Sequence, residues 1–519
     1  MGAQVTYLSS ARPAVRSLPA IKAGSAWTAV LISASFGLYL TASWTLGNLA
    51  VADGRVMART VQAWMVFFGA IPGIRQVTAG GAPLPLLLQL PFALLPTVTW
   101  PGVGAAIVGC AMAALLLAAV AVGLAALGIG PRARLLLLAL CAVQPMLVFG
   151  AALGSGGVTT AATTAWAFVL AIRWAVTGRS LNLILSAFVL GVACLASYWS
   201  ILAAFAIVGV VLATGKGDRD RAYAQATAYV VPIVGVVLPW LLIVALVGRA
   251  ADAQNLPEQL TSPDSPLPVG LVVLYLAAVS SCFCLWRALR EGLRTRRPLE
   301  LLLSGMAATL LVPGIASWQT GGHIRAAELL PVLPAGVLLT AWWIKRHPPR
   351  IRPLALAAAA GMLIASMAVQ LWAWNAGSGS RTEQRLAQMV ETGRLKAADP
   401  IERKIGMYLA QRQAGRGVLL DKRLGYRAMY WDGGAGSFYT SADAASLPGL
   451  IAQPQRYLRY VLVSHLGQEP NADAVDRTFG GLYRNGSSWA TLEQEWPVGA
   501  SPGNGWRLYR VLSSEPAHG

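Results

Sequence analysis

Residues 27–59 read WTAVLISASFGLYLTASWTLGNLAVADGRVMAR, in which an uncharged apolar run over 27–52 is followed by an acid and two arginines. An apolar run of this length predicts a helix that crosses a membrane. Asp53 then lies at the far mouth of that helix, where a carboxylate is costly unless it meets water, a cation or a substrate. Asp53 is therefore the first candidate for a functional residue.

The composition extends this membrane pattern over most of the 519 residues. Hydrophobic residues make up 56% of the chain and charged residues only 12%, roughly half the share that soluble proteins carry. We therefore predict a polytopic α-helical membrane protein with about 11 transmembrane helices. Their expected positions are 27–50, 102–127, 134–150, 158–177, 181–196, 199–214, 224–248, 268–287, 299–317, 326–344 and 353–375.

The net charge of +19 comes mainly from Lys and Arg clusters in alternate loops between the apolar runs. The positive-inside rule places such loops in the cytoplasm, together with the N-terminal segment 1–26. The clusters therefore indicate a multi-pass topology in the plasma (inner) membrane rather than binding of nucleic acid. Arginines that fall in outer loops depart from this pattern: Arg55, Arg59, Arg75, Arg249 and Arg325.

The first outer loop, residues 51–101, is long enough to carry structure of its own within a membrane domain over 27–376. Residues 55–69 have the apolar spacing of an amphipathic helix, which is typical of helices that lie at a membrane interface. Residues 83–96 are apolar but too short to span, with a proline at either end. If they spanned, the later basic clusters would fall outside, so we expect this stretch to lie in the interface or to re-enter.

The composition changes after Trp374, and residues 377–519 are polar. Helical and strand patterns alternate there, which predicts a small α/β domain. Eleven spans place this C-terminal domain on the extracytoplasmic side. The expected elements are helices over 401–413 and 473–484, buried strands over 417–421 and 460–464, and a last strand over 506–512.

Asp53 admits two interpretations. Beside Gly54 at the start of a loop, its side chain could cap a helix or be solvated. As a carboxylate at the membrane face, it could instead be a general base that takes a proton from an acceptor hydroxyl. Arg55, Arg59 and Arg75 on the same loop could contact lipid headgroups, or bind the phosphate of a polyprenyl carrier.

A second outer loop, over 319–328, contributes His323, Arg325 and Glu328 where a late span begins. These residues could anchor that span at the interface, with Arg325 and Glu328 paired three residues apart. The functional alternative is that Arg325 and His323 hydrogen-bond a phosphate at the headgroup level. Both interpretations stay open on the residues alone.

Tyr198 and Trp199 fall at an outer turn between two short apolar runs. Aromatic residues at this depth usually belong to the interfacial belt of a membrane protein. The functional alternative is a surface on which a sugar ring stacks.

Motifs for nucleotides, redox cofactors and metals are absent from the sequence. It has no Walker motif, no glycine-rich dinucleotide fingerprint after a strand, no His/Cys zinc spacing and no serine nucleophile elbow. All five cysteines lie in apolar stretches, which leaves the polar C-terminal region without a disulfide framework. A nucleotide-driven enzyme is therefore disfavoured, and no cofactor is expected.

Several short strings resemble the GT-C superfamily of glycosyltransferases, and within it the protein O-mannosyltransferase and aminoarabinose-transferase group (glycosyltransferase family thirty-nine). Asp53-Gly54-Arg55 opens the first outer loop, as an acid does in that group. Ala82-Pro83-Leu84-Pro85-Leu86 is similar to its proline-leucine segment. His323-Ile324-Arg325 leads into the Leu-Leu-Pro-Val-Leu-Pro run over 329–334, like the basic residue before its Leu-Pro-x-x-Pro helix. An outer α/β domain that ends in Trp506-Arg507-Leu508-Tyr509-Arg510-Val511 completes the likeness.

The resemblance implies that Asp53 is the catalytic base and that Arg325, with His323 beside it, binds the lipid phosphate. Three departures leave the identity of the donor, and dependence on a divalent metal, open. Gly54 stands where many relatives have a second acid, and the turn over 154–157 is glycine-rich where the group often has an Asp. The third is Ser197-Tyr198-Trp199, which replaces a common Lys.

These observations together predict a membrane glycosyltransferase with an inverting mechanism. It would move a hexose or pentose from a polyprenyl-phosphate donor to an acceptor hydroxyl on a glycan, lipid or protein at the outer face of the membrane. Arg55 and Arg59 would assist in binding the phosphate, and Tyr198, Trp199, Glu328 and Arg75 would contact the substrates. The alternative is a transporter, flippase or scaffold for lipid-linked sugars, which should show broken, polar helices at mid-membrane and paired repeats.

Overall fold

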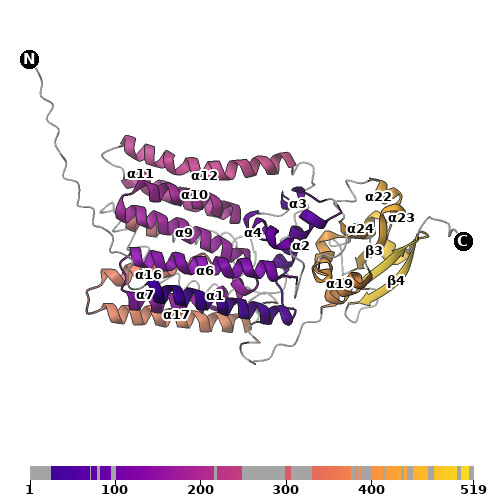
Figure 1. The fold of residues 1–519 in the computed structure, drawn as a ribbon, viewed down its shortest axis with the longest axis horizontal. Helices are drawn as coiled ribbons and strands as arrows, with labels where there is room; N and C mark the ends of the chain where they lie inside the picture. Colours follow the sequence, from indigo (N-terminus) through magenta and orange to yellow (C-terminus); the bar gives the residue numbers. More distant parts are fainter. Residues whose placement is uncertain are drawn as a thin grey trace, which may run out of the picture.

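The computed structural model describes residues 25–512 with internal gaps. The gaps are 71, 79–81, 95–100, 215–218, 248–297, 306–329, most of 376–399, 413–416, 434–437, 441–447, 466–472 and 499–503. The molecule is elongated, with a bundle of long helices at one end and a sheet at the other (Figure 1).

Long apolar helices coincide with most of the predicted spans. Four of the described helices are long and apolar enough to cross a membrane, and a bent pair adds a fifth candidate. The bundle consists of α1 (Ser25–Asn48), α6 (Val103–Ala126), α7 (Pro131–Ala142), α8 (Pro145–Ala152), α9 (Gly156–Thr177), α10 (Ser180–Ala196), α11 (Ile201–Thr214), α12 (Arg219–Val247), α16 (Val332–Arg346) and α17 (Arg352–Asn375). The protein is thus a helical membrane protein. The total of eleven spans stays a prediction, because 268–287 and most of 299–317 lie outside the described residues.

The span predicted over 134–150 coincides with a bent pair of helices. The chain forms α7 and α8 there, which meet at a 58° bend and together are apolar enough to be one candidate span. Pro145 causes the break, because proline lacks the N–H that would continue the α7 hydrogen-bond ladder and its ring clashes with the preceding turn. The Gln144 side chain, buried at the bend, donates to the Leu363 carbonyl oxygen of α17 at 3.1 Å.

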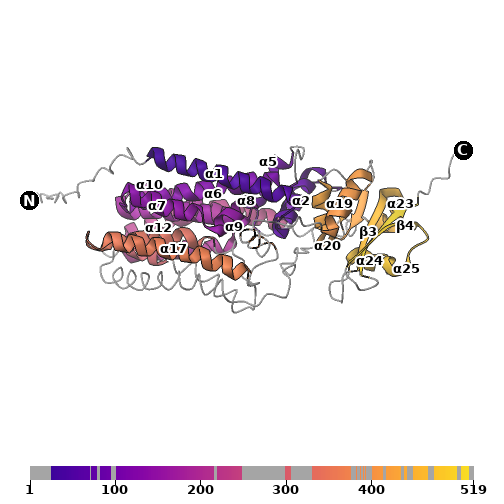
Figure 2. The ribbon, with the colours of Figure 1, turned by 90° about the horizontal axis from the view of Figure 1, so that it is seen from below.

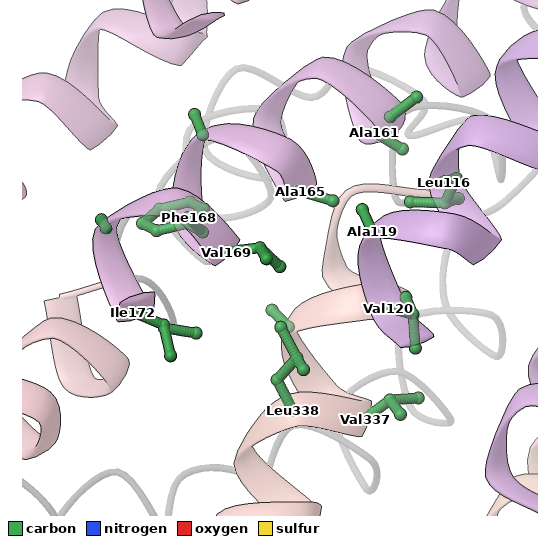
Figure 3. Close-up of a cluster of buried hydrophobic side chains, with 14 of the residues drawn as sticks. Leu116, Ala119, Val120, Ala161, Ala165, Phe168, Val169, Ile172, Val337 and Leu338 are labelled. Atoms are coloured by element: carbon green, nitrogen blue, oxygen red, sulfur yellow. The ribbon is translucent and has the colours of Figure 1, made fainter. Parts of the chain in front are cut away.

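The core of the bundle lies where α6, α9 and α16 meet. Figure 3 shows Val169 of α9 and Leu338 of α16 pointing toward one another, with Val120 of α6 on the side of Val337. A Cβ atom at Gly123 would lie 2.7 Å from Leu338 Cδ2 and 3.0 Å from Val169 Cγ2. This close approach of three helices needs a glycine on α6, since a larger side chain would push them apart.

The basic loops gather at the end of the bundle away from the sheet. The turns over 127–130, 178–179 and 347–351 lie there, next to the basic residues that begin or end the flanking helices (Figure 1). A Cβ atom at Gly128 would be 2.8 Å from Lys345 Nζ, so the turn over 127–130 lies close to the basic end of α16. The segregation of positive charge expected from the sequence is therefore present along the bundle axis.

The first outer loop forms α2 (Gly54–Phe68) and three short helices, α3 (Arg75–Thr78), α4 (Leu84–Leu87) and α5 (Leu90–Ala93). The predicted amphipathic helix over 55–69 is confirmed as α2. Its apolar face is mostly buried against protein, however, which corrects the expectation of an interfacial helix: Val61 and Trp64 are buried, and Phe67 and Phe68 stay exposed. Within 83–94, the described part of the apolar stretch over 83–96, the chain forms the two short helices α4 and α5.

The C-terminal part of the chain contains a five-stranded sheet of order β2-β1-β3-β5-β4. The predicted strands over 417–421 and 460–464 are confirmed as β1 (Gly417–Leu420) and β3 (Leu458–His465), and the predicted last strand as β5 (Gly505–Val511). Two strands were not predicted, β2 (Phe438–Thr440) and β4 (Ala490–Pro497). The strands β2, β1 and β3 run parallel, while β5 and β4 are antiparallel to their neighbours.

Short helices flank this sheet. They are α19 (Ile401–Arg412), α20 (Lys422–Asp432), α22 (Pro448–Ala452), α23 (Pro454–Tyr457), α24 (Ala474–Thr478) and α25 (Leu482–Asn485). The helix predicted over 401–413 is confirmed as α19. The single helix predicted over 473–484 is two helices, because Gly480 and Gly481 both adopt positive φ angles and break it.

The sheet and the first outer loop share one hydrophobic cluster. It joins Trp64 and Val61 of α2 to Tyr430 and Met429 of α20. Figure 2 shows α19 and α20 lying between α2 and the strands. The rings of Trp64 and Tyr430 stack with centroids 6.2 Å apart. The loop that begins with Asp53 is thus held on one side by the bundle and on the other by the sheet.

Candidate functional site

Asp53 is the N-cap residue of α2. Its backbone is extended, with φ −79° and ψ 137°, and its Oδ1 atom accepts hydrogen bonds from the backbone N–H groups of Arg55 at 2.9 Å and Val56 at 3.3 Å. A carboxylate is favoured there by the unpaired N–H groups and by the positive end of the helix dipole. The other oxygen, Oδ2, accepts no hydrogen bond from the part of the chain that the structure describes. The half-buried carboxylate thus uses one oxygen for the helix.

Arg59 lies one turn farther along α2 and points toward the bundle. Its Nε donates to the Arg55 carbonyl oxygen at 3.3 Å, and its Nη2 donates to the Gly154 carbonyl oxygen at 3.4 Å. Burial lowers the pKa of the guanidinium to about 10, the negative charge of Asp53 acts to raise it, and the positive charge of Arg55 lowers it further. The charges of Asp53 and Arg59 therefore attract one another at one end of α2, and Arg59 stays protonated at neutral pH.

The turn between α8 and α9 forms the opposite wall of this site. Gly154 has a φ of +72°, and a Cβ atom there would lie 2.4 Å from the Ala105 carbonyl oxygen of α6. A Cβ atom at Gly156 would lie 2.8 Å from Arg59 Nη1. Gly154 and Gly156 thus admit the close packing of α6 and the Arg59 side chain. Ser155 caps α9 by accepting a hydrogen bond from the Gly157 N–H at 3.2 Å.

Tyr426 and Arg427 of α20 approach Gly54, the residue after Asp53, from the sheet side, and no sequence pattern indicated either of them. A Cβ atom at Gly54 would lie 3.0 Å from the Tyr426 hydroxyl oxygen and 4.0 Å from Arg427 Nη2. The Arg427 Nε donates to the Tyr426 hydroxyl at 3.1 Å, and its Nη1 lies 3.4 Å from Glu402 Oε1 of α19. The space that a second acid at position 54 would need is therefore filled by Tyr426.

The remaining predicted residues that the structure describes lie on three different elements. Arg55 follows it on α2 and is exposed. Arg75 is the first residue of α3. Tyr198 and Trp199 belong to the 3-10 helix η1 (Tyr198–Ser200), between α10 and α11, with exposed fractions of 46% and 55%. The Tyr198 hydroxyl accepts a hydrogen bond from Trp240 Nε1 of α12 at 3.4 Å.

The predicted phosphate-binding residues of the second outer loop lie outside the described residues. His323, Arg325 and Glu328 all fall within 306–329. Their meeting with Asp53 is therefore still a prediction. Within the described ranges, no group of three or more His, Cys, Asp or Glu side chains could hold a metal ion.

A separate pair of buried acids lies at the carboxyl ends of β1 and β3. Asp473 accepts hydrogen bonds from the Ser464 N–H and hydroxyl and from the first N–H groups of α24. Asp421, also buried, accepts one from the Ala474 N–H at 2.8 Å. Burial, and secondly the charge of Asp421, raise the pKa of Asp473 to about 7. These bonds tie α24 to the sheet.

Comparison with known proteins shows similarity in structure only. No family model matches the chain, and no curated protein matches it. ArnT from Cupriavidus metallidurans bound to undecaprenyl phosphate is similar with a TM-score of 0.55 and 15% identity, over 95% of this chain and 100% of that one. The apo state of the same ArnT is similar with a TM-score of 0.55 and 14% identity, over 93% of this chain and 98% of that one. For the Archaeoglobus fulgidus oligosaccharyltransferase in the apo form, the TM-score is 0.48 and the identity 10%, over 84% of this chain and 69% of that one. The resemblance to GT-C proteins is thus confirmed at the level of the fold.

Proposed function

We propose that this protein is a membrane glycosyltransferase that moves a monosaccharide from a polyprenyl-phosphate donor to an acceptor hydroxyl at the outer face of the plasma membrane. The observation that carries the proposal is that Asp53, which caps α2, and Arg59, in the first part of α2, lie near enough for their charges to interact where α2 meets the α8–α9 turn. A half-buried carboxylate beside a guanidinium offers a proton acceptor and an anion-binding group in one place. The likeness of the whole chain to ArnT, whose structure holds undecaprenyl phosphate, supports the choice of donor.

In the proposed reaction, the acceptor hydroxyl attacks the anomeric carbon of the sugar from the face opposite the phosphate. Asp53 takes the hydroxyl proton, and the oxygen that is free of hydrogen bonds from the described residues, Oδ2, is the proton acceptor. A new bond forms between the acceptor oxygen and the anomeric carbon, while the bond from that carbon to the phosphate oxygen breaks. The electron pair of the broken bond leaves with the polyprenyl phosphate, and the configuration at the anomeric carbon is inverted.

Arg59 is proposed to stabilise the negative charge that develops on the departing phosphate. Its pKa of about 10 keeps it protonated throughout the neutral range. Hydrogen bonds to two backbone carbonyl groups hold the guanidinium in place before the donor arrives, and such preorganised charge is the most effective kind. Arg55, exposed on the same turn of α2, would contact the phosphate or the neighbouring lipid headgroups.

The other predicted residues have proposed roles that rest on the sequence. Arg325 and His323 would complete the phosphate site, and Glu328 and Arg75 would contact the substrates. Tyr198 and Trp199 are exposed, which suits a surface that meets a sugar ring or lipid. The acceptor would be a glycan, a lipid or a protein.

The proposed topology places the N-terminal segment 1–26 in the cytoplasm and residues 377–519 outside, with the membrane domain over 27–376. The segregation of basic loops to the end of the bundle away from the sheet supports this orientation (Figure 1). The proposed site then faces the outer leaflet, where a polyprenyl-phosphate donor can enter laterally.

The test is transfer by the purified protein in proteoliposomes. A panel of polyprenyl-phosphate hexoses and pentoses is supplied beside the matching nucleotide sugars, with lipid, glycan and peptide acceptors, and the released polyprenyl phosphate is measured by mass spectrometry. We expect release from at least one polyprenyl-phosphate donor and none from nucleotide sugars. Release from nucleotide sugars alone, or movement of the intact donor across the bilayer without cleavage, would refute the proposal.

A further inference from the structure

One face of α20 contacts the first outer loop at three places. Lys422, Tyr426 and Tyr430 are spaced four residues apart, so they share one face of the helix. The Lys422 Nζ donates to Gln76 Oε1 of α3 at 3.2 Å, and Tyr430 stacks on Trp64 in the second half of α2. Tyr426 lies between them, with its hydroxyl over Gly54. The C-terminal sheet and its flanking helices, which we call the sheet unit, therefore hold the first outer loop at both ends of α2.

The contact at Gly54 is the one adjacent to Asp53. With 3.0 Å between a Cβ atom at Gly54 and the Tyr426 hydroxyl oxygen, any side chain at position 54 would force one partner to move. Tyr426 cannot move easily, because it is only 3% exposed and its hydroxyl accepts a hydrogen bond from Arg427. Arg427 is in turn paired with Glu402 on α19. The ion pair of Glu402 with Arg427 and the hydrogen bond of Arg427 to Tyr426 thus fix the Tyr426 hydroxyl next to Gly54, the first residue of α2.

We propose that Tyr426 is a positioning residue for Asp53, so that the C-terminal sheet unit completes the site on the membrane domain. The geometry of the cap explains how. Asp53 Oδ1 is held by the N–H groups of the two residues after Gly54, and the Met57 N–H donates to the Asp53 carbonyl oxygen at 2.9 Å. A displacement of Gly54 therefore displaces the carboxylate, and a misplacement of about 1 Å at a reacting group lowers a rate by roughly 100-fold.

The role of Tyr426 in catalysis rests on the proposed function, whereas the contact itself does not. Local preference and tertiary contact make opposite predictions at Gly54. Alanine is favoured over glycine within a helix, so Gly54→Ala alone should strengthen α2. The Tyr426 hydroxyl opposes the added methyl group, so the same substitution should displace the cap. Tyr426→Phe removes that hydroxyl and makes room for the methyl group at position 54. The double variant should therefore recover the wild-type geometry of the Asp53 cap.

The experiment is a double-mutant cycle of Gly54→Ala and Tyr426→Phe in the full chain, with Tyr430→Phe as the matched control. The Tyr430 hydroxyl is buried and has no hydrogen-bond partner among the described residues, so its removal tests loss of a tyrosine oxygen from the same helix face. Hydrogen exchange of the amides over 54–57 reports the cap without any substrate. Transfer kinetics with a polyprenyl-phosphate sugar give kcat and KM for the donor.

We expect Gly54→Ala to speed exchange over 54–57 and to lower kcat at least 10-fold, with KM for the donor within about twofold of wild type. Adding Tyr426→Phe should restore both to within about threefold. Adding Tyr430→Phe should restore neither. The inference is overturned if Gly54→Ala behaves as wild type in exchange, or if the control substitution rescues as well as Tyr426→Phe. If exchange follows the cycle but the wild-type protein cleaves no donor, the proposed function fails while the contact of Tyr426 with the Asp53 turn stands.

Discussion

The two interpretations of Asp53, helix cap and general base, can be separated by substituting it with residues that do one task only. Asparagine and serine are both good N-cap residues, and neither accepts a proton as a carboxylate does. Alanine does neither task. The three variants therefore separate the contribution of Asp53 to the stability of α2 from its contribution to the rate of sugar transfer.

The structure sets the size of each effect. Two hydrogen bonds from α2 to Oδ1 would be lost in Asp53→Ala, and loss of an N-cap side chain costs roughly 1 kcal/mol of stability. Asp53→Asn and Asp53→Ser keep a capping side chain, so they should lower the free energy of unfolding by at most a few tenths of a kcal/mol. Loss of a general base removes about 100- to 10,000-fold in rate, which is about 3 to 5 kcal/mol in the barrier. Turnover should therefore fall similarly in all three variants. Only Asp53→Ala should also show a clear loss of stability in thermal unfolding.

The binding of the donor supplies an internal control. The negative charge of Asp53 acts to raise the pKa of Arg59, so its neutralisation lowers that pKa further, but Arg59 stays protonated near neutral pH. A phosphate near Arg59 would also be released from repulsion by Asp53. We expect KM for the donor in Asp53→Asn to be unchanged or lower, with the whole loss in kcat.

The assay measures polyprenyl phosphate released per minute in proteoliposomes, together with thermal unfolding in detergent for each variant. Turnover by Asp53→Asn within about threefold of wild type would show that Asp53 is only a cap. The proton would then have to be taken by another group, and the assignment of the base would be wrong.

Three further predictions follow from other contacts. Arg59→Lys keeps the charge but loses the fixed guanidinium fork, so KM for the donor should rise roughly 10- to 100-fold with a normal melting temperature; an unchanged KM argues against a phosphate at Arg59. The folded-state pKa of Asp473 is about 7, above its usual 3.8, so the folded state binds this proton more tightly and the free energy of unfolding should fall by roughly 4 kcal/mol as pH rises from about 4 to above 7. Asp473→Asn, which can still cap α24, should flatten this profile in pH-dependent unfolding; a profile that stays equally steep assigns the proton elsewhere. Gly154→Ala combines a φ of +72° with a 2.4 Å approach to the Ala105 carbonyl oxygen and should cost more than about 2 kcal/mol, whereas Gly209→Ala, with nothing within 4 Å, should be neutral or stabilising in the same unfolding measurement.

The local elements of this protein could be predicted from its sequence. Hydropathy located the long helices, because about 20 apolar residues in a row are stable only across a membrane or in a large core. The amphipathic spacing of residues 55–69 predicted α2, and short apolar runs predicted the buried strands β1 and β3. The capping role of Asp53, one of the two interpretations, was also within reach, since an Asp before a helical pattern is a local signal.

Other features could be decided only by packing. The apolar face of α2 could have met lipid as well as protein, and the periodicity is the same in both cases; α20 decided it by covering Val61 and Trp64. The approach of Arg59 to the Gly154 turn and of Tyr426 to Gly54 joins segments far apart in the chain. No spacing in the sequence encodes these distances, because they depend on how whole helices cross. The sequence thus determined which segments are helices, strands and charged loops, and the tertiary structure decided which side chains stand next to Asp53.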